Sequence, residues 1–94
     1  MTPVTANDVR RFLLDRFSAP IAANGLHPVD LGDDFDLLNA GVVDSLGVIE
    51  MISAVEQHFR ITVDFEPMAP EELTVLGPFS RFVADNATNN APVP

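Results

Sequence analysis

An apolar stripe in the middle of the chain constrains the fold more than any other feature. Hydrophobic residues recur at helical spacing at Val48, Ile49, Ile52, Val55 and Phe59. At about 100° per residue these positions share one side of an α-helix, and the run is too long for an ordinary strand. The sequence therefore predicts a helix from about Ser45 to His58 that buries this stripe.

The residues just before this helix are suited to start it and to present a hydroxyl group. Asp44 is a favoured N-cap residue, and its carboxylate suits the partial positive charge of a helix start. Ser45 then lies in the first turn, where a phosphate ester on its hydroxyl would meet backbone N–H groups that lack helical partners. Taken alone, the Asp-Ser pair is better explained as a plain helix cap than as an attachment site.

A longer string resembles a known family. It runs from Asp36 to Gly47 as Asp-Leu-Leu-Asn-Ala-Gly-Val-Val-Asp-Ser-Leu-Gly, and the apolar helix pattern and Ile-Thr-Val at 61–63 follow it. Together these residues resemble the acyl carrier protein family, including its aminoacyl and D-alanyl carrier relatives. In that family the serine of the Asp-Ser-Leu motif receives 4'-phosphopantetheine from coenzyme A. The resemblance extends over residues 5–86 and implies that Ser45 is the attachment residue and Asp44 the motif aspartate.

The fold expected from both arguments is all-α. It is a small antiparallel bundle of three longer helices and one short helix, with a long first loop. We expect residues 1–86 to form the carrier domain and residues 87–94 a flexible tail. The predicted core consists of Phe12, Leu13, Phe17, Ile49, Ile52, Val55, Phe59, Phe79 and Phe82.

The other elements follow from local signals. Thr5 and Asp8 resemble a capping box for a helix from about Ala6 to Ser18. Residues 19–40 contain Pro20 and several other turn residues, which predicts a long loop. Its expected apolar anchors are Leu26, Val29, Leu31, Phe35 and Leu37.

The chain after the central helix has shorter elements. Residues 60–63 look too short to pair as a strand, and residues 70–73 look like one helical turn. The last helix can start at Thr74 or at Gly77, and we favour Gly77 because Pro78 then needs no N–H donor.

Charge and composition limit the possible partners. Five arginines, no lysine and fourteen acidic residues give a formal net charge of −9. Such a surface repels nucleic acid and anionic membranes and attracts basic protein surfaces. The chain has no cysteine, so any thiol chemistry must come from a prosthetic group. It also lacks a signal peptide pattern and a membrane-spanning run, so we expect a cytoplasmic protein. We also expect it to be a monomer.

Two catalytic or metal-binding alternatives fit poorly. The acidic cluster Asp30, Asp33, Asp34 and Asp36 does not match the EF-hand pattern, because Phe35 stands where glycine is needed. Loose association with divalent ions stays open there, beside a merely solubilising role, but we predict no metal site. For a serine hydrolase, the chain lacks the strand and the first glycine of a nucleophile elbow around Ser45. We therefore expect no intrinsic catalysis.

The function implied by the resemblance is that of a discrete carrier. It would hold an acyl or aminoacyl thioester on the arm and present it to separate enzymes. Its partners would be a phosphopantetheinyl transferase, a loading enzyme, and downstream transferases or synthases. Gly47 stands where the fatty acid synthase form has an acidic residue, which counts against primary fatty acid synthesis. The competing hypothesis is an unmodified interaction module of the same fold. The helix face opposite the predicted core is the expected partner face, and it carries Leu46, Glu50, Ser53 and Gln57.

Overall fold

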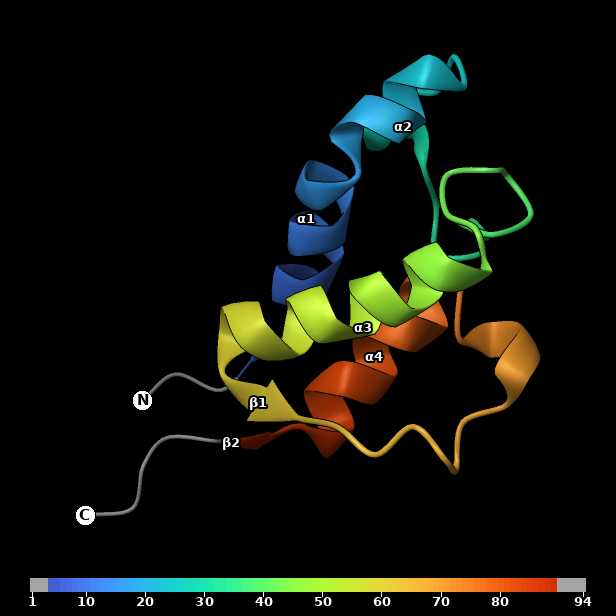
Figure 1. The fold of residues 1–94 in the computed structure, drawn as a ribbon. Coiled ribbons are helices and arrows are strands. Elements are labelled where there is room, and N and C mark those ends of the chain that lie inside the picture. The colour runs from blue at the N-terminus through green and yellow to red at the C-terminus, as the bar shows by residue number, and fades with distance from the viewer. Residues whose placement is uncertain (1–3, 90–94) are drawn as a thin grey trace.

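The computed structural model describes residues 4–89, which form a small helical bundle (Figure 1). Its α-helices are α1 (Ala6–Arg16), α2 (Ser18–Ala23), α3 (Ser45–Phe59) and α4 (Leu76–Asn86), and two single 3-10 turns are η1 (Pro28–Asp30) and η2 (Pro70–Glu72). Two short strands, β1 (Ile61–Thr62) and β2 (Thr88–Asn89), complete the described part of the chain. The predicted all-α bundle is confirmed. No helix within residues 4–89 is long and apolar enough to cross a membrane.

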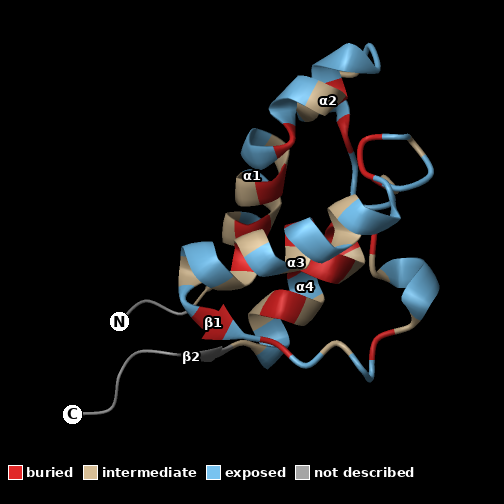
Figure 2. Cartoon of the chain, viewed as in Figure 1, coloured by how far each residue is buried: buried red, intermediate tan, exposed pale blue. Residues whose placement is uncertain are grey.

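The core lies where α1 packs against α4 and α3 crosses them (Figure 2). Of the predicted core residues, Leu13, Phe17, Val55 and Phe79 are buried, whereas Phe12, Ile52, Phe59 and Phe82 are partly buried and pack against the core. Phe59 meets the Phe12 ring edge-on, with 5.6 Å between the ring centroids. Phe65, which the prediction omitted, stacks on Phe79 with a centroid separation of 5.5 Å.

The predicted buried stripe of α3 was wrong at one position, Ile49. Ile49 is 66% exposed, whereas Met51, which the predicted stripe omitted, is 0% exposed. A stripe through Val48, Met51, Ile52 and Val55 fits helical spacing as well as the predicted one does. The structure adopts this second stripe, so Ile49 lies at its outer edge and faces solvent.

A second correction concerns residues 19–40, which were expected to be a loop throughout. Residues Ser18–Ala23 form α2, and Ile21 on this helix is buried in the core. Pro20 is the third residue of α2, where a helix has no use for the missing N–H group, so this proline does not break the helix. Among the expected loop anchors, Leu31 and Leu37 are buried, but Val29 is 92% exposed and anchors nothing.

The chain after α3 also differs from the prediction. Arg60 ends the helix in the left-handed conformation at φ 55°. The following residues form β1, which pairs antiparallel with β2, so that Ile61 faces Asn89 and Thr62 faces Thr88. The expectation that residues 60–63 cannot pair was therefore wrong. In the expected tail, residues 88–89 form β2, and residues 90–94 lie outside the described part of the chain.

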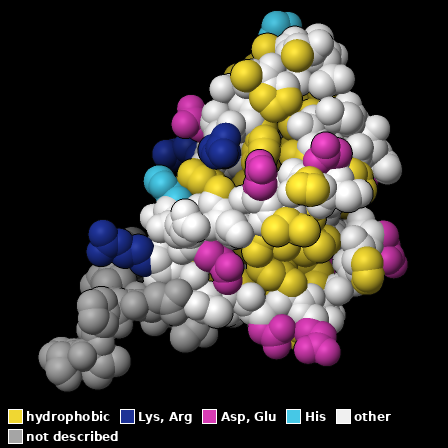
Figure 3. Space-filling view, viewed as in Figure 1, with side chains coloured by type: hydrophobic (Ala, Val, Ile, Leu, Met, Phe, Trp, Pro, Cys, Tyr) yellow, Lys and Arg dark blue, Asp and Glu magenta, His cyan; other side chains and the backbone are white. Residues whose placement is uncertain are grey.

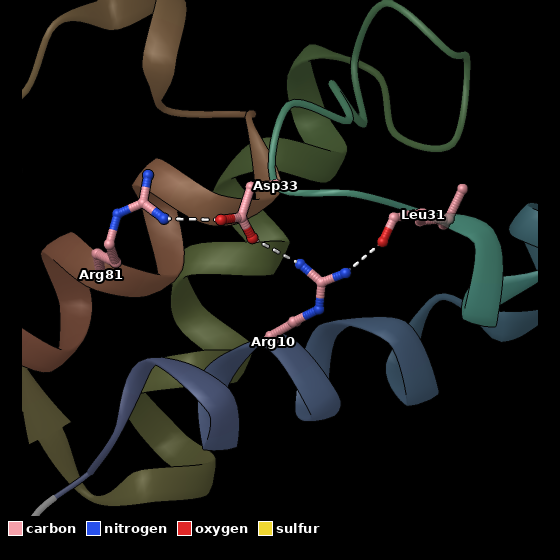
Figure 4. A network of polar contacts seen from close by, with 4 residues as sticks. All are labelled: Arg10, Leu31, Asp33 and Arg81. Atoms are coloured by element: carbon pink, nitrogen blue, oxygen red, sulfur yellow. Dashed lines mark hydrogen bonds and ion pairs between the residues drawn. The ribbon is translucent and has the colours of Figure 1, made fainter.

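Asp33 connects the long segment between α2 and α3 to two helices (Figure 4). Its carboxylate accepts hydrogen bonds from Arg10 of α1 at 2.9 Å and from Arg81 of α4 at 3.0 Å. Arg10 also donates to the carbonyl oxygen of Leu31. The backbone carbonyl of Asp33 accepts from the N–H of Gly77 at 2.8 Å. These contacts fix the start of α4, which begins at Leu76, one residue before the predicted Gly77.

Candidate functional site

Ser45 is the first residue of α3, and its side chain is exposed. Asp44 caps this helix, because its Oδ1 accepts a hydrogen bond of 2.7 Å from the N–H of Gly47. The Asp44 carbonyl accepts the N–H of Val48 at 3.0 Å, which closes the first helical turn. Both residues therefore have the local geometry that the sequence predicts: a capping aspartate followed by a free hydroxyl at the positive end of a 15-residue helix.

Buried side chains and backbone hydrogen bonds fix the segment that leads to Ser45. Gly41 adopts φ +78°, which a residue with a side chain rarely does. The two following residues, Val42 and Val43, are buried, and both of their N–H groups donate to the carbonyl of Leu37, at 2.9 and 3.2 Å. The chain therefore turns sharply at Gly41, passes through the core at Val42 and Val43, and returns to the surface at Ser45.

An open groove of about 710 Å³ runs beside Ser45. One wall comes from the end of α1 and from α2, and the other comes from residues 38–43 and the start of α3. Its lining residues are Arg16, Phe17, Ala19, Pro20, Leu38, Gly41, Val42, Val43, Asp44, Ser45, Gly47 and Glu50. The sequence did not predict the wall from α1 and α2, because it lies some 25 or more residues before Ser45 and carries no motif.

The predicted partner face is exposed along α3. Leu46 is 66% exposed, and Glu50, Ser53 and Gln57 are exposed as well. Ile49 joins this surface as a second apolar side chain. Figure 3 shows hydrophobic side chains gathered on the face that α3 crosses, with acidic side chains scattered around them. Glu56 lies at the margin of this surface, where its carboxylate accepts a hydrogen bond of 3.0 Å from the N–H of Val63.

The arrangement does not favour a hydrolase or a metal site. His58 lies thirteen residues after Ser45 on the same helix, which corresponds to about 20 Å along the axis. Its ring stacks on Phe12 with 4.3 Å between centroids, and the groove residues around Ser45 include neither this histidine nor His27. Within residues 4–89, no group of three or more His, Cys, Asp or Glu side chains could hold a metal ion.

The acidic cluster of the long segment has structural roles instead. Asp33 pairs with two arginines, as described above. Asp36 accepts hydrogen bonds at Oδ1 from the N–H groups of Leu38 and Asn39, at 3.0 and 3.2 Å, and from the hydroxyl of Thr74 at 2.7 Å. Asp33 therefore holds the segment against α1 and α4, and Asp36 holds it against Thr74, which lies just before α4.

The site consists of an exposed serine that starts a capped helix in a small helical bundle. Residues 22–77 match the family described as the phosphopantetheine attachment site, and the chain belongs to this family. It is therefore a carrier domain of the acyl carrier protein type, whose prosthetic group is covalent 4'-phosphopantetheine. Such domains are not catalysts; a phosphopantetheinyl transferase modifies them.

Three curated relatives are D-alanyl carrier proteins of streptococci. The chain is 46% identical over 39 residues to the protein of Streptococcus suis strain 98HAH33, which is 42% of this chain and 49% of the relative. It is 57% identical over 30 residues to that of Streptococcus mutans serotype c, which is 32% of this chain and 38% of the relative. The matches thus span about half the length of these relatives or less. No solved structure matches the chain.

The residues around Ser45 fit a phosphopantetheine group. The hydroxyl is exposed, and the groove beside it offers both apolar walls and an opening to solvent. Gly47 keeps the first turn compact, because a Cβ there would lie 3.1 Å from the Cβ of Val43 and 3.2 Å from Oδ1 of Asp44. No side chain at this position covers the hydroxyl group.

Proposed function

We propose that Ser45 is the attachment residue and that the protein carries its cargo as a thioester on the arm. The observation that carries this proposal is the exposure of the Ser45 hydroxyl at the first position of α3, inside the region that matches the phosphopantetheine attachment family. Within residues 4–89, the other serines lie outside the Asp-Ser-Leu sequence, and Ser80 is buried.

The attachment reaction needs little from this chain beyond position. The Ser45 oxygen would attack the pyrophosphate phosphorus nearer the pantetheine. The bond from this phosphorus to the bridging oxygen would break, and adenosine 3',5'-bisphosphate would leave with magnesium assisting. The hydroxyl proton goes to a base of the transferase. Phosphoryl transfer depends mainly on positioning and charge stabilisation. The helix start supplies orientation, and Asp44 helps to orient the transferase and its metal ion.

Mass spectrometry after incubation with coenzyme A and a broad-specificity transferase tests this assignment. The wild-type chain should gain the mass of one phosphopantetheine, whereas Ser45→Ala should stay folded and gain none. Ser18→Ala is the matched control, because Ser18 is also an exposed serine at the first position of a helix but lies outside the α3 partner face, and it should be modified normally. A wild-type chain that gains no mass would favour the competing hypothesis, an unmodified interaction module.

The names of the relatives support an aminoacyl cargo. The relatives matched at 46% and 57% identity are named D-alanyl carrier proteins, so we propose an amino acid as cargo, with D-alanine as the first candidate. ATP-dependent adenylating enzymes load such cargo in the cytoplasm, where we place the protein. The test offers the holo protein D-alanine with a D-alanine-activating ligase and, separately, fatty acids with an acyl-activating ligase. Only the D-alanine reaction should give a hydroxylamine-sensitive adduct, and the reverse result would refute this cargo.

We further propose that loading enzymes bind the α3 surface formed by Leu46, Glu50, Ser53 and Gln57. An exposed leucine next to the attachment residue is a suitable anchor for a partner pocket. Since two of these four residues are uncharged polar ones, partner binding should depend more on Leu46 than on charge. Leu46→Ala should therefore slow loading more than Glu50→Ala does, with both variants of near wild-type stability. Normal loading of Leu46→Ala would show that the docking face lies elsewhere.

A further inference from the structure

The groove beside Ser45 has an uneven distribution of charge. Two of its lining residues, Asp44 and Glu50, are acidic, and Arg16 is the one cation among the described residues that line it. A phosphodiester attached at Ser45 would bring a third negative charge to this place. Without a compensating cation, these like charges would repel one another, although solvent would screen the effect.

Arg16 lines the same groove as Ser45 and carries a charge of the sign needed for that compensation. It is the last residue of α1, and its side chain is exposed. Its guanidinium carbon lies 5.7 Å from the centre of the Phe17 ring. The ion pairs found within residues 4–89 are those of Arg10 and Arg81 with Asp33, so Arg16 is not committed to a carboxylate there. An arginine fork is well shaped to bind phosphate oxygens.

The groove also offers apolar surface next to this arginine. The side chains of Phe17, Val42 and Val43 are buried beneath it, and Ala19 and Pro20 extend the wall toward α2. Next to the phosphate, the pantetheine arm has a methylene group and then a carbon bearing two methyl groups, and it continues through two amides. Methyl groups suit these walls, and the open side of the groove leaves the amides hydrated.

We propose that Arg16 binds the phosphodiester of the arm and that the groove between α1, α2 and the start of α3 holds the first part of the arm. This inference rests on Ser45 being the attachment residue. Arg16 is a positioning residue: it holds the arm along the surface of its own protein until a partner enzyme displaces it. The thiol end, and any cargo on it, then starts each reaction cycle from a defined place.

Nuclear magnetic resonance of the holo protein tests this proposal. Wild type, Arg16→Gln and Arg11→Gln are converted with coenzyme A and a transferase, and mass spectrometry confirms one arm on each. Arg11 is the matched control, because it is exposed on the same helix and does not line the groove. The measured signals are the nuclear Overhauser effects between the two pantetheine methyl groups and the Phe17 ring or the Val43 methyl groups.

We expect these signals in wild type and in Arg11→Gln. In Arg16→Gln they should fall by roughly two- to fivefold, as expected for loss of an exposed charge pair, and the ³¹P resonance should shift. Equal signals in all three proteins, or no signals in wild type, would refute the role of Arg16 while leaving Ser45 as the attachment residue. Failure of wild type to gain the arm would overturn both proposals. All three proteins should unfold at similar denaturant concentrations, since the substituted side chains are exposed.

Discussion

The two helices that follow the long connecting segments start in opposite ways. At the start of α3 a single side chain, that of Asp44, caps the helix, and the first residue is exposed. At the start of α4 no side chain caps the helix. Instead, the carbonyls of Phe35 and Asp33 accept the N–H groups of Leu76 and Gly77, each at 2.8 Å.

The difference separates a structural helix start from a reactive one. The first two N–H groups of α4 donate to main-chain carbonyls of the segment between α2 and α3, and both residues, Leu76 and Gly77, are buried. A local cap leaves the start of α3 accessible to an enzyme and to a phosphate group. In this fold, the start of α4 is buried by another segment and contributes to stability. The start of α3 is covered only by its own cap, so a partner enzyme can reach it.

The largest expected loss of stability comes from adding a side chain at the buried start of α4. In Gly77→Ala, the new Cβ would lie 2.6 Å from the Cβ of Asp33 and 2.9 Å from its backbone oxygen, so the main chain must move. Overpacking of this kind costs about 1–3 kcal/mol. Chemical denaturation measures the loss of unfolding free energy.

The control for this substitution is Gly47→Ala at the open start. There the nearest atoms are the side chains of Val43 and Asp44, at 3.1 and 3.2 Å, which can shift by a few tenths of an ångström. The gain in helix propensity also offsets part of the crowding, so we expect a change within about 1 kcal/mol. If both substitutions cost the same, the contrast between the two starts does not hold.

A smaller effect is expected from removing the cap at the open start. Asp44→Ala deletes the acceptor of the Gly47 N–H group and should lower stability by about 1 kcal/mol. Asp44→Asn should retain most of this stability, because asparagine caps helices nearly as well. Thermal unfolding followed by circular dichroism compares the three proteins. An alanine variant as stable as wild type would mean that the start of α3 is held by its neighbours alone.

The smallest effect concerns α1, which starts with a reciprocal capping box between Thr5 and Asp8. The N–H of Thr5 donates to the carboxylate of Asp8 at 3.1 Å, and the N–H of Asp8 donates to the hydroxyl of Thr5 at 3.1 Å. The hydrogen bond from the Thr5 backbone, helped by the Thr5 side chain and by Arg11, lowers the pKa of Asp8.

Because the pKa of Asp8 is lowered on folding, its stabilising contribution is complete above the ordinary pKa of an aspartate. This contribution is lost as the pH falls through the lowered value in the folded state. The stability difference between wild type and Asp8→Asn should therefore be largest near neutral pH and shrink in acid. Denaturation series at several pH values measure this difference. A difference that does not change with pH would show that the charge of Asp8 contributes nothing to the cap.

The sequence predicts best those features that are set by neighbouring residues. The caps at Thr5 and Asp44 and the position of Ser45 at the start of α3 depend on a few adjacent residues, and the structure agrees with all three. The family match and the exposed face of α3 also follow from this local pattern.

The features that failed depend on distant partners. Helical spacing permits two rotations of α3, and only packing against the rest of the bundle decides that Met51 is buried and Ile49 exposed. The β1–β2 pairing needs a partner from the end of the chain. Proline is compatible with both a loop and a first helical turn, which is why α2 was missed around Pro20. The groove wall from α1 has no signal in the sequence near Ser45.

The contacts of Asp33 also bear on how fast the chain can fold. Its carboxylate joins residues that are 23 and 48 positions away in the sequence, through Arg10 and Arg81. Helices form in microseconds or less from local contacts, whereas joining distant segments requires the closure of long loops. The start of α4 gains its caps only when these segments have met. We therefore expect this protein to refold more slowly than a helical bundle of similar length that is held together by local contacts.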